Sequence, residues 1–332
     1  GIMSSSNTTG GNEKMNKAQR VKAVMERKEA DFVPAGFWFH YKPDFTVEEM
    51  IEEHLKLYRE TDMDVIKIMQ DYAYPVTGEI HCAEDWYHIG IKGTDSREME
   101  KMTAVIRGIK ERAGEEVLIF QTMFGPFKAA SIAFGDDVLM KYSKEAPEAV
   151  MAGIKNLADG LEAWAEAYLD AGADGIYYSA QFGEEGRFSK EEWEQLVRPF
   201  DLQILQVAEQ RKDKYNILHI CGESEYAFKT HVDWFYDYPA DLANWSVKDN
   251  GYSLEEGREH FSCVILGGLN NKGNILHGPK EEIRKEVQAV LESFGTEGIM
   301  IGADCTIQGE GIRLDYIREA VKAAHTYKKG EE

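Results

Sequence analysis

The sequence is short of positive charge. Its 332 residues contain 38 Lys and Arg against 59 Asp and Glu, which gives a formal net charge of −21. Nucleic-acid grooves and anionic membrane surfaces are bound through clustered Lys and Arg side chains, and no basic run here exceeds a few residues. The composition therefore argues against a nucleic-acid partner and against a protein that binds an anionic membrane surface.

Long apolar runs are also missing. No window holds the ~18 consecutive apolar residues that a membrane span requires, and the mean hydropathy is −0.45. The first residues lack the basic segment followed by an apolar segment that marks a secretory signal. We interpret residues 1–14 as a tag and flexible tail and residues 15–330 as a single domain. These absences predict a soluble, cytoplasmic protein with no membrane partner.

Cysteine is scarce, with four residues in the whole chain: Cys82, Cys221, Cys263 and Cys305. Four are too few for a disulfide scaffold at this size, and without an export signal they should remain reduced thiols. Since 43% of the residues are hydrophobic and 11% aromatic, the chain can bury a large core. The question is therefore which of these thiols carry chemistry.

Short apolar runs recur between longer helical patterns, as in chains that alternate strands with crossover helices. Most of the runs lack polar alternation, which is typical of parallel strands covered on both faces. Eight such runs predict eight strands: Val33–Phe39, Asp64–Met69, Val117–Met123, Gly175–Gln181, Asn216–Cys221, Leu242–Ser246, Val264–Leu269 and Gly298–Asp304.

The segments between these runs carry helical spacing. The longest has apolar residues every three or four positions from Val150 to Tyr168, with Pro147 where the helix should begin and Gly172 where it should end. Similar patterns predict further helices at about 47–60, 95–113, 190–212, 280–294 and 313–327. A doubly wound sheet would usually show a Gly-rich dinucleotide loop after an early strand, and none is present. The predicted fold is α/β, a single (β/α)8 TIM barrel.

Three residues are candidates for a metal centre. His219 and Cys221 are two apart on the fifth predicted strand and so point to the same face, and Cys305 directly follows the eighth strand. The C-terminal ends of barrel strands form one rim, where active sites are built. Each residue alone reads as an ordinary buried side chain. Together, one His and two Cys predict a catalytic Zn²⁺ with its fourth position open to substrate or water.

Other polar residues lie near the same predicted rim. Asp71 follows the second strand and is a candidate catalytic acid or base, with a loop acid or helix cap as the alternative. Gln181 ends the fourth strand and is a candidate for substrate binding. Asp304, Glu223 and Glu310 flank the predicted ligands. They could orient the histidine or fill the fourth position, although each reads more naturally as a solvated acid.

The sequence resembles the uroporphyrinogen decarboxylase superfamily over roughly residues 15–327. The similarity is strongest in Asp241–Ser246, Val264–Asn271, Gly278–Ile283 and Phe294–Cys305. This superfamily includes zinc-dependent cobamide:thiol methyltransferases, of the coenzyme M type. Their zinc ligands lie in a His-x-Cys pair and a distant Cys, and the resemblance places them at His219, Cys221 and Cys305.

The decarboxylase branch of the superfamily resembles this chain less. Its Arg-rich segment should fall near Val33–Asp44, which here contains no arginine, and its tyrosine falls near Ile132. Its late His-Gly pair is replaced around Cys305, and only its acid after the second strand is kept, as Asp71. A porphyrinogen with eight carboxylates needs compensating cations, which a chain of net charge −21 supplies poorly.

The methyltransferase resemblance implies that zinc holds a substrate thiol as thiolate, which attacks the methyl group on a corrinoid cobalt (methylcobamide). In this family a separate carrier protein presents the corrinoid, so a carrier protein and a small-molecule thiol are the implied partners. Two alternatives stay open: a decarboxylase of a tetrapyrrole or other polycarboxylate, and a barrel that binds corrinoid or thiol without turnover. The methyl donor, the acceptor and the oligomeric state are not determined, and a homodimer is one option.

Overall fold

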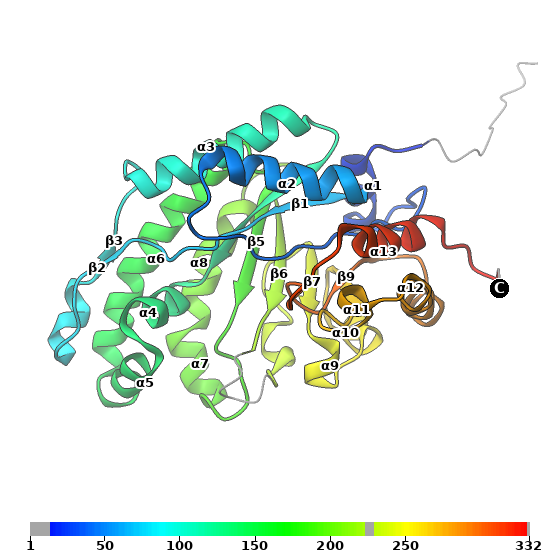
Figure 1. The fold of residues 1–332 in the computed structure, drawn as a ribbon. Coiled ribbons are helices and arrows are strands. Elements are labelled where there is room, and N and C mark those ends of the chain that lie inside the picture. The colour runs from blue at the N-terminus through cyan, green and yellow to red at the C-terminus, as the bar shows by residue number, and fades with distance from the viewer. Residues whose placement is uncertain (1–13, 223–228, 331–332) are drawn as a thin grey trace, which may run out of the picture.

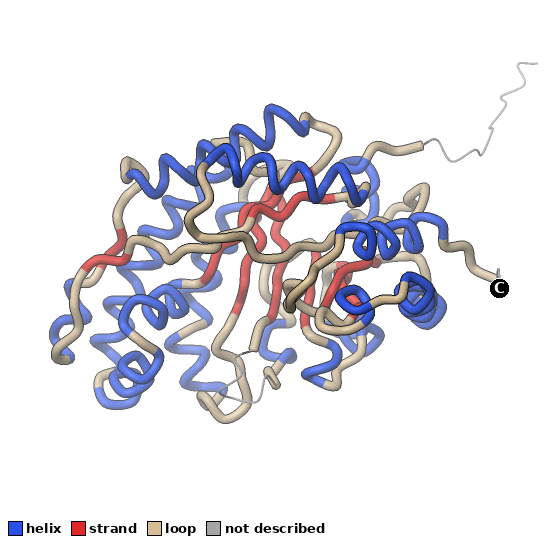
Figure 2. The backbone as a smooth tube through the Cα atoms, in the orientation of Figure 1, coloured by secondary structure: helices blue, strands red, loops and turns tan. Residues whose placement is uncertain are grey.

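The centre of the protein is a curled parallel sheet of seven strands with helices around it (Figures 1 and 2). The computed structural model describes residues 14–222 and 229–330, so the predicted tail falls almost wholly outside the described residues. The strands follow one another across the sheet in chain order and every neighbouring pair is parallel, as in an α/β barrel. They are β1 (Val65–Ile68), β4 (Leu118–Phe124), β5 (Gly175–Ala180), β6 (Tyr215–Ile220), β7 (Leu242–Trp245), β8 (Val264–Leu269) and β9 (Ile299–Ala303).

The predicted first strand, Val33–Phe39, is not a regular strand, and this expectation was wrong in detail. The segment nevertheless lies between β9 and β1, where an eighth strand would close the barrel. Ala35 forms a parallel bridge with Ile301, whose N–H donates to the carbonyl of Pro34 at 2.9 Å. On the other side, the N–H of Asp64 donates to the carbonyl of Ala35 at 2.8 Å. Pro34 has no N–H to continue the ladder, which explains why the pairing stays irregular.

Helices cover the outer face of the sheet, as the alternating pattern predicted (Figure 1). The α-helices are α1 (Lys17–Met25), α2 (Val47–Thr61), α3 (Arg97–Ala113), α4 (Pro126–Phe134), α5 (Asp136–Glu145), α6 (Pro147–Asp170), α7 (Lys190–Leu196), α8 (Arg198–Glu209), α9 (Val247–Asn250), α10 (Leu254–His260), α11 (Asn274–His277), α12 (Lys280–Phe294) and α13 (Leu314–Thr326). Two short 3-10 helices, η1 (Ala83–His88) and η3 (Val232–Phe235), and a small antiparallel pair, β2 (Val76–Thr77) with β3 (Gly90–Ile91), complete the described elements. Among the described residues, no helix combines the length and the apolar character needed to cross a membrane.

The helix boundaries follow local sequence signals. The longest helix, α6, begins at Pro147 as predicted, and Gly172 with a φ of 121° lies just beyond its end. The single helix predicted over 190–212 is instead broken into α7 and α8 at Val197. Pro199 stands in the first turn of α8, where its missing N–H costs nothing but where it cannot continue the preceding helix.

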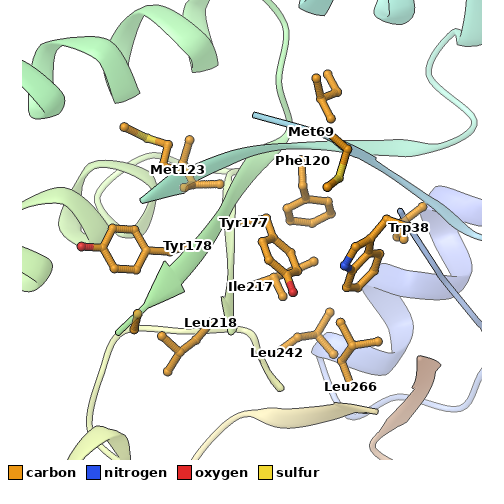
Figure 3. Packing of buried hydrophobic residues seen from close by; sticks show 14 of the residues in the cluster. Trp38, Met69, Phe120, Met123, Tyr177, Tyr178, Ile217, Leu218, Leu242 and Leu266 are labelled. Atoms are coloured by element: carbon orange, nitrogen blue, oxygen red, sulfur yellow. The ribbon is translucent and has the colours of Figure 1, made fainter. Parts of the chain in front are cut away.

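Large apolar side chains fill the inside of the curled sheet. Alternation along each strand sends one set inward and the next outward to the helices. On β5, Tyr177 points inward while Tyr178 points away, and Ile217 and Leu218 divide in the same way on β6 (Figure 3). The labelled side chains that gather around Tyr177 are Trp38, Phe120, Ile217, Leu242 and Leu266, and all of them are at most 3% exposed.

A buried carboxylate ties the closing segment to its neighbours at the N-terminal end of the barrel. Asp64, just before β1, accepts hydrogen bonds from Arg20 Nη1 at 2.7 Å, from the N–H of Ala35 at 2.8 Å and from His325 Nε2 at 2.7 Å. Arg20 also contacts Asp31 at 2.7 Å. Because charged groups are costly to bury unless they are paired, this network fixes α1, the closing segment, β1 and α13 together.

A second buried carboxylate lies between the sheet and the outer helices. Asp201 of α8 accepts hydrogen bonds from the hydroxyl of Tyr178 and, at 2.7 Å, from the hydroxyl of Tyr238. Burial raises the pKa of Asp201 to about 7, although both hydroxyls and nearby Arg198 oppose the shift. The folded protein therefore holds this carboxyl in its protonated form over a pH range in which an unfolded chain would ionise it.

This shift predicts a pH-dependent effect of Asp201→Asn. An unfolded Asp titrates near pH 4, so between about pH 4 and pH 7 only the folded state keeps the proton. The contribution of Asp201 to the free energy of unfolding is thus fully present below about pH 4 and is lost as the pH rises to about 7. Because Asn resembles the neutral acid, the variant should gain stability relative to wild type between pH 5 and pH 8, by about 1–3 kcal/mol.

The measurement is urea unfolding of both proteins at several pH values. The matched control is Asp170→Asn, which alters a carboxylate whose side chain is 68% exposed and should leave the pH profile parallel to that of wild type. If Asp201→Asn also gives a parallel profile, the carboxyl is not held protonated.

Candidate metal centre

The structure brings together the three side chains that were predicted to bind metal. His219 lies in β6, Cys221 is the first residue after that strand, and Cys305 follows β9. One ligand atom from each lies within 4.8 Å of the other two, and the distance from Cys305 Sγ to His219 Nε2 is 3.4 Å. The alternation along β6 and the common edge of the parallel strands account for this meeting.

The spacing suits a small metal ion. Zinc–nitrogen bonds of about 2.0–2.1 Å and zinc–sulfur bonds of about 2.3 Å in tetrahedral geometry separate the two ligand atoms by about 3.5 Å. The 3.4 Å between Cys305 Sγ and His219 Nε2 agrees with that value. Two thiolates and one imidazole are also a donor set that zinc prefers over magnesium or calcium. The residues present therefore fit a zinc ion, and three protein ligands leave a fourth position open.

Asn244 fixes the orientation of the histidine ring. It is the register partner of His219 on the neighbouring strand β7, and its Oδ1 lies 2.5 Å from His219 Nδ1. Its Nδ2 donates to the carbonyls of Leu266 at 2.8 Å and Ala303 at 3.0 Å. With both N–H groups used in this way, Oδ1 must be the acceptor, so Nδ1 of the histidine carries the proton. His219 Nε2 is left with its lone pair directed at the cysteines, as a metal ligand requires.

The cysteines differ sharply in their electrostatic surroundings. A hydrogen bond with the Cys221 thiol, together with the nearby His219, holds the pKa of the Cys305 thiol well below its usual range even though Cys305 is largely buried. Cys263 lies at the opposite end of the barrel before β8, where burial raises its pKa to about 12 and the nearby Arg27 offsets only a small part of that shift. The cluster at the rim thus favours thiolate, while Cys263 stays a neutral thiol that packs against the core.

An aromatic ring and a buried lysine lie behind the cluster. Tyr177 of β5 stacks on the His219 ring at 5.8 Å between centroids. Lys67 of β1 packs against the same ring: its Nζ lies 4.1 Å from the centre of the Tyr177 ring and 5.3 Å from the centre of the Trp38 ring. Burial lowers the pKa of Lys67 to about 8, partly offset by Cys305, Asp71 and Cys221, whose negative charges favour the ammonium form.

Asp71 lies on the rim but does not contact the cluster. Its Oδ1 is 2.6 Å from Nδ1 of His40, and its Oδ2 accepts a hydrogen bond from the N–H of Tyr41 at 2.8 Å. The His40 side chain is 62% exposed while that of Asp71 is 6% exposed. The acid therefore holds the end of the closing segment and presents the imidazole of His40 at the mouth of the barrel.

Gln181 faces the same side as the cluster. Ser179 and Gln181 alternate along the end of β5 in step with Tyr177, and Gln181 Nε2 donates to Ser179 Oγ at 3.3 Å. Gln181 is buried, and its Oε1 has no hydrogen-bond partner among residues 14–222 and 229–330. Because a buried amide oxygen without a partner is costly, this atom is a potential acceptor for a bound molecule.

The acidic residues that flank the predicted ligands differ in exposure to solvent. Asp304 is not the solvated acid that its position suggested: it is 1% exposed, and its Oδ2 accepts from Ser246 Oγ at 3.3 Å and from the N–H of Lys248 at 3.2 Å. Burial raises its pKa to about 6. Asp304 thus ties the loop after β9 to the start of α9, and Asn244 rather than Asp304 orients the histidine. Glu310 is exposed, and Glu223 lies outside the described residues.

Two residues of this site, Asn244 and Lys67, were missed from the sequence. Both carried a signal, since each is a polar residue inside an otherwise apolar strand: Asn244 within Leu242–Trp245 and Lys67 within Val65–Ile68. A polar group at such a position is buried, so it must either find a partner or serve a function. The sequence does not reveal which residue of a neighbouring strand it will meet.

Comparison with known proteins extends this description. The family model "Uroporphyrinogen decarboxylase (URO-D)" matches residues 63–327. Two curated proteins named Methylcobamide:CoM methyltransferase MtaA, both from Methanosarcina barkeri, are 25% identical over 234 residues and 24% identical over 242 residues. These alignments cover 69% and 70% of this chain and 64% and 66% of the relatives, so slightly under two thirds of their length is matched.

The fold has a solved counterpart. A structure described as a methyltransferase from Methanosarcina mazei superposes with a TM-score of 0.75 at 16% sequence identity and covers 93% of this chain and 98% of that one. At this identity the likeness shows the fold alone. It supports the barrel architecture, in which a segment between β9 and β1 completes the ring of strands.

The contrast between the cysteines predicts selective alkylation. In chelator-treated protein carrying Cys82→Ser, which removes the exposed thiol, iodoacetamide at pH 7 should modify Cys305 at least about tenfold faster than Cys263, because the thiolate is the reactive form. Peptide mass spectrometry over time measures both rates. Equal rates, or faster modification of Cys263, would show that the rim cluster does not favour thiolate.

Proposed function

Since the chain belongs to the uroporphyrinogen decarboxylase (URO-D) family, we propose that it is a zinc-dependent methyltransferase that moves a methyl group between a corrinoid and a thiol or related acceptor. The observation that carries this proposal is the cluster of His219, Cys221 and Cys305, with the histidine oriented by Asn244. The similarity to two methylcobamide:CoM methyltransferases supports the same reaction class.

Each residue of the cluster has a proposed part in the chemistry. His219 Nε2 and the sulfurs of Cys221 and Cys305 would hold the ion. Zinc bound there would lower the pKa of a substrate thiol and keep its sulfur as a nucleophilic thiolate at neutral pH. Asn244 holds the proton of the histidine on Nδ1 and aims Nε2 at the ion, and the strand ends hold the donors in place before substrate arrives. Because one ligand is a histidine, the protein contributes two negative charges rather than three.

The rim supplies further candidate contacts to substrate. Gln181 Oε1 would accept a hydrogen bond from the methyl acceptor or donor, since it has no partner among the described residues. Asp71 is the candidate acid or base, and it would act with His40, whose exposed ring it holds at 2.6 Å. A proton released when the thiol binds would leave through this exposed imidazole, which has two ring nitrogens that can exchange protons with solvent.

The proposed partners follow from the reaction. The corrinoid would be presented at the barrel mouth by a separate carrier protein, which makes the rim a docking surface as well as a catalytic one. The two ligand cysteines must stay reduced, so a reducing compartment such as the cytoplasm is part of the proposal.

Decarboxylation of a polycarboxylate is less well supported by the same rim. The segment Val33–Asp44 contains no arginine, and the side chain that it sends to the interior beside Tyr177 is the aromatic Trp38, which is 3% exposed. A substrate with many carboxylates would meet few fixed cations here, in a chain whose net charge is −21.

The test is metal content together with methyl transfer from free methylcobalamin to a thiol. The purified protein should contain about one zinc per chain and should demethylate methylcobalamin, as followed by its absorption spectrum. Cys221→Ala and Cys305→Ala should lose the metal and nearly all transfer, whereas the matched control Cys263→Ala should keep both. Full activity in a zinc-free preparation would contradict the proposal. Carbon dioxide release that survives Cys305→Ala would favour a decarboxylase, and thiol binding without methylated product would favour a binding protein.

Replacement of Asn244 predicts a graded loss. Asn244→Leu keeps the volume but removes the acceptor for His219 Nδ1–H, so zinc affinity should fall about 10- to 100-fold while all three ligands remain. Competition with a chromogenic chelator measures the affinity. Asn156→Leu, an exposed asparagine on α6, serves as the control. Unchanged affinity in Asn244→Leu would mean that this hydrogen bond does not set the histidine tautomer.

A further inference from the structure

Lys67 is a largely buried lysine whose ammonium group has no hydrogen-bond acceptor among the residues that the structure describes. Lys67 lies in the middle of β1 and is 8% exposed. Among residues 14–222 and 229–330, no atom accepts a hydrogen bond from its Nζ. The nearby carboxylate of Asp71 directs its two oxygens elsewhere, to His40 and to the N–H of Tyr41. An ammonium group with three N–H donors, little exposure and no protein acceptor among the described residues would be stabilised by an anion bound beside it.

The rings that touch Lys67 compensate only part of this cost. Its Nζ lies 4.1 Å from the centre of the Tyr177 ring and 5.3 Å from that of Trp38. Cation–π contacts of this kind stabilise a buried cation less than a charged hydrogen bond does. Tyr177 in turn stacks on His219 at 5.8 Å, and the charges of Cys305 and Cys221 act on the ammonium. Lys67 and His219 therefore contact the same aromatic ring, and the ammonium lies close enough to the two cysteines for their charges to act on it.

The net charge of the proposed metal site indicates which fourth ligand the ammonium of Lys67 would favour. Two thiolates cancel the charge of a divalent ion, and His219 with its proton on Nδ1 is neutral. A neutral fourth ligand such as water would leave the site neutral, so that Asp71 alone would offset the charge of Lys67. A thiolate in the fourth position would give the site a charge of −1, which the ammonium balances. Buried charges are stable when they are paired, so the second state is the one that Lys67 favours.

We propose that Lys67 is a positioning residue that selects an anionic sulfur ligand at the cluster of His219, Cys221 and Cys305, so that the site takes up thiols as thiolates in preference to water. This inference rests on the metal centre of the proposed function and adds the residue that sets its ligand preference. Lys67 acts through its charge and does not itself bind the metal. The substrate class it implies is a thiol whose sulfur is the recognised anion, with or without a further acidic group.

The experiment uses the full chain loaded with Co²⁺, which reports thiolate binding through a sulfur-to-cobalt absorption band. Wild type and Lys67→Met are titrated at pH 7 with 2-mercaptoethanol, which has no acidic group, and with 3-mercaptopropionate, which has a carboxylate. We expect Lys67→Met to bind both thiols about tenfold or more weakly, because a buried charge pair has been lost. Lys67→Arg, which keeps the charge, should restore most of the affinity.

Three controls separate the possible outcomes. Lys56→Met removes one exposed positive charge on α2 and should bind both thiols as wild type does. Thermal unfolding checks that each variant is folded, and Lys67→Gln replaces Lys67→Met if the latter fails to fold. Equal affinity of folded Lys67→Met or Lys67→Gln and wild type for 2-mercaptoethanol would overturn the proposal. So would a loss confined to 3-mercaptopropionate, which would assign Lys67 to the acid group of the substrate.

Binding of Co²⁺ to wild type separates a failure of the inference about Lys67 from a failure of the proposed metal centre. If wild type binds Co²⁺ but Lys67→Met takes up thiols normally, the inference about Lys67 fails and the metal centre stands. If wild type binds no Co²⁺ at all, the proposed function fails and the inference falls with it.

Discussion

Hydrogen bonds from the Val33–Phe39 segment to β9 on one side and to the start of β1 on the other close the curled sheet and complete the rim on which the candidate site residues lie. At the N-terminal end of the barrel, Asp64 holds the segment in place by accepting hydrogen bonds from Arg20, Ala35 and His325. With the sheet closed, the C-terminal ends of strands far apart in the chain lie on one rim. Lys67 of β1 and His219 of β6 can then act on the same site, although 152 positions separate them in the sequence.

The site combines two cysteines, a histidine held by a hydrogen bond, and a nearby lysine. Cys305 favours its thiolate form, Asn244 holds the proton of His219 on Nδ1, and the ammonium of Lys67 lies near the Tyr177 ring that stacks on His219. A chain with a net charge of −21 places one lysine inside the barrel, beside this site. Negative charge on the cysteines and on Asp71 favours the ammonium form of that lysine, which burial alone would disfavour.

Much of the fold was predictable because it depends on local patterns. Apolar runs without alternation gave the parallel strands, and Pro147 gave the start of α6. The exceptions also have physical causes. Pro34 prevented a regular first strand, and Pro199 divided the helix expected over 190–212. At the site, His219, Cys221 and Cys305 were recognisable from spacing and strand ends. The buried state of Asp304 was not, since it depends on the loop after β7 that folds over it.

The sequence by itself determined the order of strands and helices, the lack of arginine in Val33–Asp44 and the set of soft ligands at two strand ends. These are properties of composition or of residues close together in the chain, so they can be predicted from short sequence patterns. Only the tertiary structure decided that Asn244 meets His219, that Asp71 holds His40 and that Lys67 lies on the Tyr177 ring. Such contacts depend on strand register and on closure of the barrel, which the sequence pattern does not express because each strand alone is compatible with many partners.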